Sequence, residues 1–248
     1  MKTAAQKTAA LDPRAGDRLP YAGHLDDHTV MTRGGDLIQM IQVDGIAFET
    51  ADSETLNHMA AVRDVVMRGI ANSSLMLYCH VIRRQVTAEL SGAQPDGFVR
   101  DLDDAWQQQL RGKKLYINDM VLMLVRRPAQ GKIGFFDRLT KWGNGTRNSA
   151  ERLADQTREL RELDAARTNL LSALSRYGPR LLGRYHDANG TCSEPLEILS
   201  ALYNGEMQPV LESTGDAGQY LPYKRISFGL DALELKGASA NTSRFGAI

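Results

Sequence analysis

The sequence predicts an α+β fold of the split βαβ, or ferredoxin-like, type. Two long stretches with helical periodicity are interspersed with short apolar stretches typical of β-strands. Stripped of insertions, the order is strand, helix, strand, strand, helix, strand, and no long helix separates the two middle strands. A helix and a hairpin follow, so we expect this core to carry inserted helices and a C-terminal extension.

A β-hairpin is predicted near the start of the chain. Residues 28–32 and 37–43 have strand-like patterns on either side of Arg33-Gly-Gly-Asp36. Gly34 and Gly35 can supply the positive φ angles that a tight turn requires.

The first long helix is predicted over residues 52–71, where Asp52 can cap the first turn and apolar residues recur along one face. Residues 75–82 are apolar on both alternating faces, which predicts a buried central strand. Residues 97–110 predict a short helix with an inward stripe. This stripe consists of Phe98, Leu102, Trp106 and Leu110.

The second half of the core is predicted to contain a strand, a long helix and a last strand. Residues 115–125 are strongly apolar, and residues 149–177 carry a leucine-rich stripe among charges of both signs. Gly178-Pro179 ends this helix, and residues 180–185 predict the last strand.

The C-terminal extension is predicted to contain one helix and one hairpin. The helix covers residues 194–203 and is closed by Asn204-Gly205, and residues 226–228 pair with 233–235. We therefore divide the chain into a flexible tail at 1–18, an α+β domain at 19–188 and an extension at 189–248.

Composition excludes several classes of function. Thirty Lys and Arg residues balance thirty Asp and Glu residues, so no overall field attracts nucleic acid or an anionic membrane. Two cysteines provide no disulfide framework and suit a reducing cytoplasm. The N-terminus lacks a secretory signal, and no apolar run approaches the ~20 residues of a membrane-spanning helix. We expect a soluble protein, peripheral to a membrane at most.

The sequence contains no nucleotide-binding loop. Gly112-Lys113 and Gly131-Lys132 lack both the preceding glycine and the following Ser or Thr of a Walker loop. Gly143-Asn-Gly145 begins like a dinucleotide loop but lacks its third glycine. No nucleophile elbow occurs either. We expect no catalytic or cofactor-binding residue in this segment.

Two groups of residues have the chemistry of metal ligands. In the first, adjacent strand residues point to opposite faces, which favours a buried thiol and ordinary histidines over a zinc site. In the second, a solvated turn is the more typical interpretation, although chelation is chemically feasible. The groups are Cys79-His80 with His186 and Cys192, and His24 and His28 beside Asp26-Asp27.

Two basic features suggest docking surfaces. The doublets Arg83-Arg84 and Arg126-Arg127 close two antiparallel strands at opposite ends, either as solvated ends that block edge association or as contacts for an acidic partner. Residues 132–142 combine aromatic and basic residues, which suits a membrane surface or a partner's groove, or else a helix folded onto its own domain. The candidate docking residues are Ile133, Phe135, Phe136, Leu139, Trp142, Arg126 and Arg127.

Longer motifs are spread along most of the chain. They are Leu19-Pro-Tyr, Leu25-Asp-Asp, Asp44-Gly with Phe48-Glu-Thr, Asn118-Asp119, Leu122 to Pro128, Cys192-Ser-Glu-Pro-Leu-Glu197, Leu202-Tyr-Asn-Gly-Glu-Met207, Gln219 to Phe228, Glu234-Leu-Lys-Gly237 and Arg244-Phe-Gly-Ala-Ile248. Together they resemble the N-terminal part of the type IV secretion, or conjugal-transfer, ATPases: the fourth VirB component and its TrbE and CagE relatives. The resemblance runs from about Leu19 to the last residue, with residues 130–149 unmatched.

The resemblance implies a parent protein that hydrolyses ATP with Mg at the cytoplasmic face of the bacterial inner membrane, powering channel and pilus assembly and transport of DNA or protein. It also implies dimers or hexamers and contacts with small inner-membrane components. The Walker motifs of the family lie downstream, and we expect that the chain is cut at Ile248 from a longer polypeptide. Docking and self-association are therefore the expected roles of this segment, with no direct nucleic-acid contact.

Two alternatives remain. A DNA-handling domain would need exposed aromatic residues on the sheet and a basic groove. A free-standing enzyme would need a pocket with perturbed carboxylates.

Overall fold

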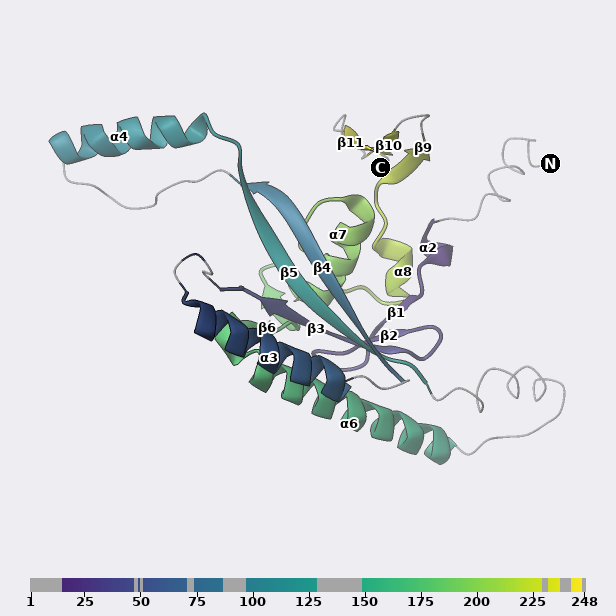
Figure 1. Cartoon of the computed structure of the whole chain (residues 1–248). Helices are drawn as coiled ribbons and strands as arrows, with labels where there is room; N and C mark the ends of the chain where they lie inside the picture. Colours follow the sequence, from purple (N-terminus) through teal and green to yellow (C-terminus); the bar gives the residue numbers. More distant parts are fainter. Residues whose placement is uncertain are drawn as a thin grey trace, which may run out of the picture.

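The computed structural model describes residues 15–46, 49, 51–70, 74–86, 97–128, 149–228, 232–236 and 242–246. A six-stranded antiparallel sheet forms the centre, and helices cover both of its faces (Figure 1). The predicted α+β class is confirmed.

The central sheet has the strand order β1-β2-β3-β5-β4, and β6 pairs with the second half of β3. The four strands that the sequence assigns to the split βαβ core therefore lie in the order β6-β3-β5-β4, with β5 antiparallel to both of its neighbours. The strands are β1 (Tyr21–His24), β2 (Val30–Thr32), β3 (Leu37–Val43), β4 (Leu75–Val86), β5 (Leu115–Arg126) and β6 (Pro179–Leu181).

The predicted hairpin of β2 and β3 is confirmed. Its turn has one residue with positive φ, Gly35 at 89°, and the Thr32 hydroxyl donates to the Asp36 carboxylate at 3.0 Å. The side chain of Asp36 therefore reinforces a turn that the glycine makes possible.

Two long helices cover one face of the sheet. Helix α3 (Ser53–Ile70) begins as predicted, because the Asp52 carboxylate accepts the amide of Thr55 at 2.7 Å. Helix α6 (Ser149–Ala173) is followed by a 3-10 turn (Ser175–Tyr177) and ends at Gly178, whose φ is 60°. The apolar stripe of α6 packs on the sheet as predicted. The buried contacts join Leu163, Leu170 and Leu174 to Leu37, Ile41, Leu122 and Leu124.

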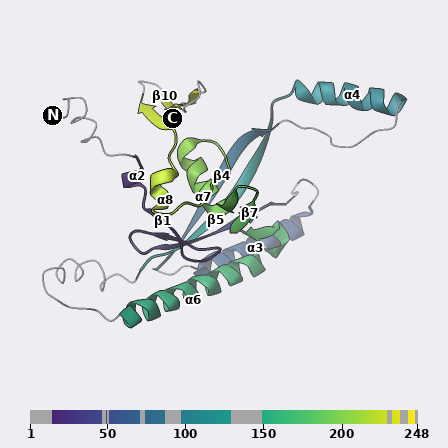
Figure 2. The ribbon, with the colours of Figure 1, turned by 180° about the vertical axis from the view of Figure 1, so that it is seen from behind.

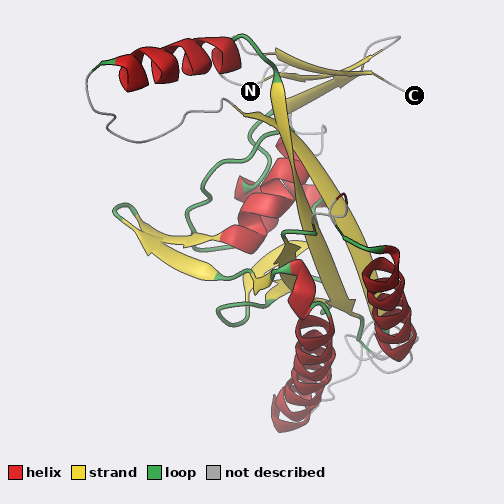
Figure 3. Cartoon of the chain, turned by 60° about the vertical axis from the view of Figure 1, so that its left-hand side comes forward, coloured by secondary structure: helices red, strands yellow, loops and turns green. Residues whose placement is uncertain are grey.

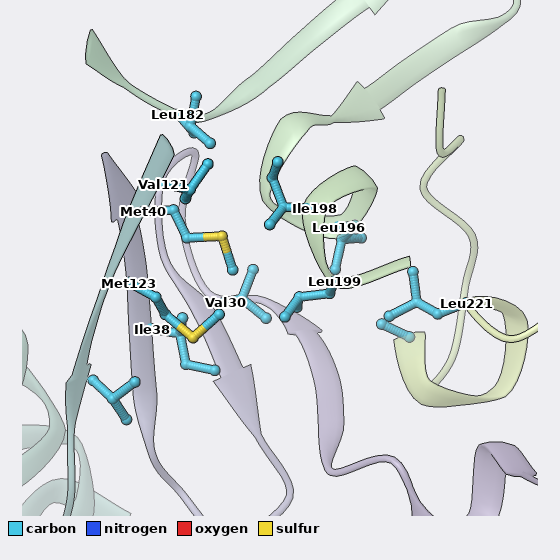
Figure 4. Packing of buried hydrophobic residues seen from close by; sticks show 12 residues of the cluster. Val30, Ile38, Met40, Val121, Met123, Leu182, Leu196, Ile198, Leu199 and Leu221 are labelled. Atoms are coloured by element: carbon cyan, nitrogen blue, oxygen red, sulfur yellow. The ribbon is translucent and has the colours of Figure 1, made fainter. Parts of the chain in front are cut away.

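The other face is covered by α7 (Glu194–Asn204) and α8 (Ala217–Tyr220), which lie on the side of the sheet opposite α3 and α6 (Figure 2). Met40 and Met123 of the sheet point toward Leu196 and Leu199 of α7 (Figure 4). The predicted extension at 189–248 thus contributes a layer of this core.

Part of the predicted tail is also structured. Residues Ala15–Arg18 form the short helix α2, where Gly16 is buried. A side chain at Gly16 would lie 2.7 Å from the carbonyl oxygen of Gly218, so only glycine allows this approach to α8.

The predicted strand at 180–185 consists of two strands in different sheets. Strand β6 ends at Leu181, and β7 (Arg184–Asp187) pairs with β8 (Gly190–Ser193). The chain leaves the sheet at Gly183, where a Cβ atom would lie 2.5 Å from Nδ1 of His28. Glycine at this position therefore allows the chain to pass close to the turn before β2 between β6 and β7. The predicted C-terminal hairpin is confirmed and gains a third strand: β9 (Arg225–Phe228), β10 (Ala232–Lys236) and β11 (Thr242–Gly246).

The β4–β5 hairpin extends well beyond the central sheet. The two strands stay paired over their full lengths, whereas β3 contacts β5 only as far as the pair Val43↔Met120. Beyond that pair the hairpin carries helix α4 (Phe98–Arg111), which projects away from the rest of the molecule (Figure 3). We call residues 81–86, residues 115–120 and α4 the arm.

The arm corrects two predictions. Strand β4 is not a buried central strand: it lies at the edge of the sheet, and none of its residues is buried. The apolar residues near its start are partly buried on both faces of the sheet: Met76 packs against one core cluster, and Leu75 and Leu77 pack against the other. The stripe of α4 is not directed inward either, because this helix has no buried residue and packs extensively on no other element of the described chain.

Candidate partner interface

Helix α4 presents an uncovered apolar face. Phe98, Leu102 and Trp106 follow one another at intervals of four residues, which places them on one side of a helix. Their exposed fractions are 80%, 57% and 54%. Single exposed apolar residues are normal on protein surfaces, but contiguous apolar patches mark sites of interaction. The face is therefore a candidate for contact with another molecule.

The helix is well formed although it packs extensively on no other described element. Its sequence is rich in Gln, Leu, Asp and Arg and contains one β-branched residue, Val99. The side-chain amide of Gln107 donates to the Asp103 carboxylate at 2.8 Å, one turn away. Gly97 precedes the helix with a φ of 108°, and Gly112 follows it. Local interactions thus stabilise α4, and its apolar face remains available.

The hairpin part of the arm adds apolar surface below α4. Val81 lies directly opposite Met120 in the β-ladder, and both side chains are exposed. The Arg83 guanidinium lies 4.7 Å from the centre of the Tyr116 ring on the same face. On the other face, Arg84 forms an ion pair with Asp119 at 2.5 Å. Both arginines of the predicted doublet therefore have partners within the arm.

The second arginine doublet lies at the base of the hairpin. The register, with Leu75 opposite Arg126 and Arg83 opposite Asn118, places the doublets at opposite ends as predicted. Arg126 is only 6% exposed, and its guanidinium contacts Glu162 of α6 at 2.8 Å. The side chain of Arg127 is exposed, and its amide donates to the Ser74 carbonyl at 2.8 Å. Arg126 therefore joins the hairpin to α6, and only Arg127 presents a charge to solvent.

The other predicted docking residues lie outside the described residues. They are Ile133, Phe135, Phe136, Leu139 and Trp142.

The turn before β2 is built around His24 and Asp26. His24 Nδ1 donates to the Asp26 carbonyl at 2.9 Å, so Nε2 can accept the Ser193 hydroxyl at 2.6 Å. Ser193 also caps α7, because its Oγ accepts the amide of Leu196 at 3.2 Å. Burial lowers the pKa of His24. A Ser–His contact of this length can activate a nucleophile, but Ser193 is fully buried, so the contact joins two parts of the fold.

Two glutamates of the motif at 192–197 also have partners within the chain. Tyr185 donates its hydroxyl to Glu197 at 2.6 Å, and the Arg180 guanidinium contacts Glu194 at 2.6 Å. Burial raises the pKa of Glu197, and the hydrogen bond to that carboxylate raises the pKa of Tyr185. The perturbed groups thus belong to a structural network around the start of α7.

The motifs at 202–207 and 219–228 meet at Asn204, which is fully buried. Its amide nitrogen donates to the carbonyl oxygens of Ser200 and Leu221, both at 2.9 Å. Its amide oxygen accepts the backbone amides of Tyr223 at 3.1 Å and Lys224 at 3.0 Å. One side chain therefore fixes the path from the end of α7 to β9.

Nothing in the described part of the chain forms an evident reaction centre. A shallow hollow of about 270 Å³ lies beside His24 and Tyr220, but its carboxylate, Glu212, is held by Arg184 at 2.6 Å. Among the described residues, no three His, Cys, Asp or Glu side chains are placed to hold a metal ion. Cys79 is exposed and Cys192 is buried.

The sheet offers no continuous stacking platform for a nucleic acid. The two exposed tyrosines of the hairpin, Tyr78 and Tyr116, lie on opposite faces. Tyr78 is paired with Met123 and shares its face, whereas Tyr116 lies seven positions before Met123 in the same strand, an odd number that places it on the other face. Base stacking on one surface would need them on the same face.

The chain is similar to proteins of one known family. Residues 28–133 match the N-terminal domain of the type IV secretion system ATPase VirB4/TrbE. The family resemblance predicted from the motifs is confirmed. The VirB4/TrbE match includes both strands of the hairpin and α4, so the arm lies within it.

Relatives extend the similarity over most of the chain. The type IV secretion system protein VirB4 of Bartonella henselae is 28% identical over 90% of this chain and 28% of its own length. VirB4 of Brucella melitensis is 28% identical over 90% of this chain and 27% of its own length. PtlC of Bordetella pertussis is 29% identical over 88% of this chain and 26% of its own length. The chain thus spans about a quarter of these relatives.

None of the helices in the described residues combines the length and the apolar composition that crossing a membrane requires.

Sequence reasoning missed the exposure of the α4 face, although a signal was present. The strand segments next to α4 include a run of three polar residues, Arg83, Arg84 and Gln85, which pair with Asn118, Ile117 and Tyr116. A sheet segment with this composition does not provide an apolar surface that could bury the stripe of α4.

Proposed function

We propose that this chain is an assembly and docking domain of a type IV secretion ATPase, and that the arm is its contact element. The observation that carries the proposal is the uncovered face of α4, formed by Phe98, Leu102 and Trp106. Burial of apolar surface stabilises a complex by roughly 25 cal/mol per Å², and aromatic residues dominate binding energy in most interfaces.

The geometry of the arm supports a role in contact rather than in folding. A paired two-stranded stem holds α4 away from the central sheet (Figure 1). The Arg84–Asp119 ion pair and the Arg83–Tyr116 contact brace this stem on both faces. A braced stem fixes the orientation of α4, and such preorganisation lowers the entropic cost of binding.

The rest of the proposed role follows from the relatives. The matched family and the named relatives are components of type IV secretion systems. We place the domain at the cytoplasmic side of the bacterial inner membrane, in contact with inner-membrane components of such a machine. ATP and Mg would be bound by the larger remainder of the parent protein. That parent would energise channel and pilus assembly and the transport of DNA or protein.

The test introduces one charge into the contact face. In the full-length parent, expressed with a complete secretion machine, Leu102→Asp should abolish co-purification of other components through the arm. The matched control is Gln108→Asp, which places the same residue on an exposed polar position of the same helix. It should leave co-purification unchanged. Equal recovery of components with both variants would refute docking through this face.

A further inference from the structure

We propose that α4 pairs with α4 of a second copy of this chain, in antiparallel orientation. The proposal rests on the arm being a protein-contact element and names its partner. Two properties of α4 support it: the spacing of its apolar face and the distribution of its charges.

The apolar face of α4, extended by the half-buried Leu110, matches itself when the helix is reversed. Phe98, Leu102, Trp106 and Leu110 are evenly spaced at four residues, so reversal about residue 104 superimposes the row on itself. In an antiparallel pair, Phe98 of one copy lies beside Leu110 of the other, and Leu102 lies beside Trp106. Such a contact is isologous, and twofold isologous contacts are the commonest in homo-oligomers. Each Trp106 would then be covered by an aliphatic side chain.

The charges of α4 are separated along its length. The first half of α4 carries Asp101, Asp103 and Asp104 against a single Arg100, whereas Arg111 ends the helix and Lys113 and Lys114 follow just beyond it. An antiparallel partner brings the acidic half of each copy beside the basic end of the other. A parallel partner would bring like charges together, at a cost in free energy. The helix dipoles favour the same antiparallel orientation.

The same charge pattern disfavours a membrane as the occupant. Surface-bound amphipathic helices are typically rich in Lys and Arg on the polar face, whereas Asp101 and Asp104 are exposed on α4. The apolar row is small beside the roughly 20 to 30 residues that each side of a standard interface contributes. We therefore expect a weak, concentration-dependent dimer of the isolated chain.

Complementary charge reversal tests the pairing. One variant carries Asp101→Lys and Asp104→Lys, and the other carries Arg111→Glu, Lys113→Glu and Lys114→Glu. In sedimentation velocity at about 100 μM, the wild-type chain should form a dimer. Each variant alone should associate about tenfold more weakly, because both halves of its helix carry the same charge. An equimolar mixture of the two variants should dimerise again, and about 1 M salt should abolish this rescue.

A control pair applies the same type of change elsewhere. Asp155→Lys and Arg158→Glu reverse an exposed ion pair on α6 and should leave dimerisation unchanged. A dimer that neither α4 variant weakens, or a mixture that fails to restore association, would overturn the pairing. So would a wild-type chain that remains monomeric, whether or not it binds vesicles containing anionic lipid. If Leu102→Asp still abolishes co-purification from the complete machine, the docking role survives and only the second copy is excluded.

Discussion

The region around α7 and the arm use their side chains in opposite ways. Around α7, polar residues form a closed network: His24 contacts Ser193, Tyr185 contacts Glu197, and Asn204 makes four hydrogen bonds to the backbone. On the arm, the largest side chains of α4 contact solvent. A motif residue whose polar groups are bonded within its own chain serves the fold. Large aromatic residues that stay mostly exposed among the described residues indicate a partner.

The residues that resemble the family therefore fall into two groups, those that build the fold around α7 and those of the arm. The motifs at 192–197, 202–207 and 219–228 build one hydrogen-bonded scaffold around α7. The arm lies within the matched domain, but α4 has no buried residue and packs extensively on no other element of the described residues. The scaffold accounts for the fold of the domain, and the arm accounts for its proposed contacts.

The largest effect is expected at Asn204. Replacing Asn204 with Ala leaves two backbone amides, of Tyr223 and of the buried Lys224, and two carbonyl groups without this partner. Each unsatisfied buried group costs about 1–3 kcal/mol. Partial relaxation should limit the total loss to roughly 3 kcal/mol. Urea unfolding measures the change, and Asn118→Ala in the exposed part of the arm is the control, with an expected change of about 0.5 kcal/mol or less. An equal loss in the free energy of unfolding for the two variants would contradict the difference proposed between the two regions.

A smaller effect is expected where the arm meets the core. Arg126→Gln removes the buried partner of Glu162, and we expect a loss of about 2 kcal/mol, because Glu162 itself is partly solvated. Arg127→Gln should change the free energy of unfolding by only about 0.5 kcal/mol. If Arg127→Gln were the more destabilising variant in urea unfolding, the structural role assigned to Arg126 would be wrong.

The smallest effect concerns pH. Burial lowers the pKa of His24 from 6.5, so the unfolded chain binds this proton more readily than the folded chain. The contribution of His24 to stability is present above pH 6.5 and is lost as the pH falls through the lowered pKa. Thermal unfolding between pH 7.5 and pH 5 should therefore show a steeper loss of stability for the wild type than for His24→Gln. Parallel pH profiles would show that His24 is not coupled to folding.

Local signals in the sequence predict many individual elements. The Asp52 cap, the Gly35 turn, the Gly178 helix end and the Asn204-Gly205 closure of α7 all depend on a few neighbouring residues. The sequence predicts where these features lie because each depends on interactions between residues that are close in the sequence.

Tertiary contacts limit what the sequence predicts beyond these elements. The apolar pattern of β4 is the same for a central strand and for an edge strand with partial cover, so its position at the edge depends on the whole sheet. The burial of Arg126 depends on Glu162, which is 36 residues away in the sequence. The close approach of the chain at Gly183 involves His28, which is more distant still in the sequence.

The most direct test compares the same substitution on two helices. Leu102 of α4 is 57% exposed, whereas Leu163 of α6 is fully buried. In urea unfolding, Leu163→Ala should lower the free energy of unfolding by about 3 kcal/mol, in the range for buried leucines. Leu102→Ala should change it by only about 0.5 kcal/mol. A loss at Leu102 comparable to that at Leu163 would show that the apolar face of α4 belongs to the folded core, and the arm could not then be a contact surface.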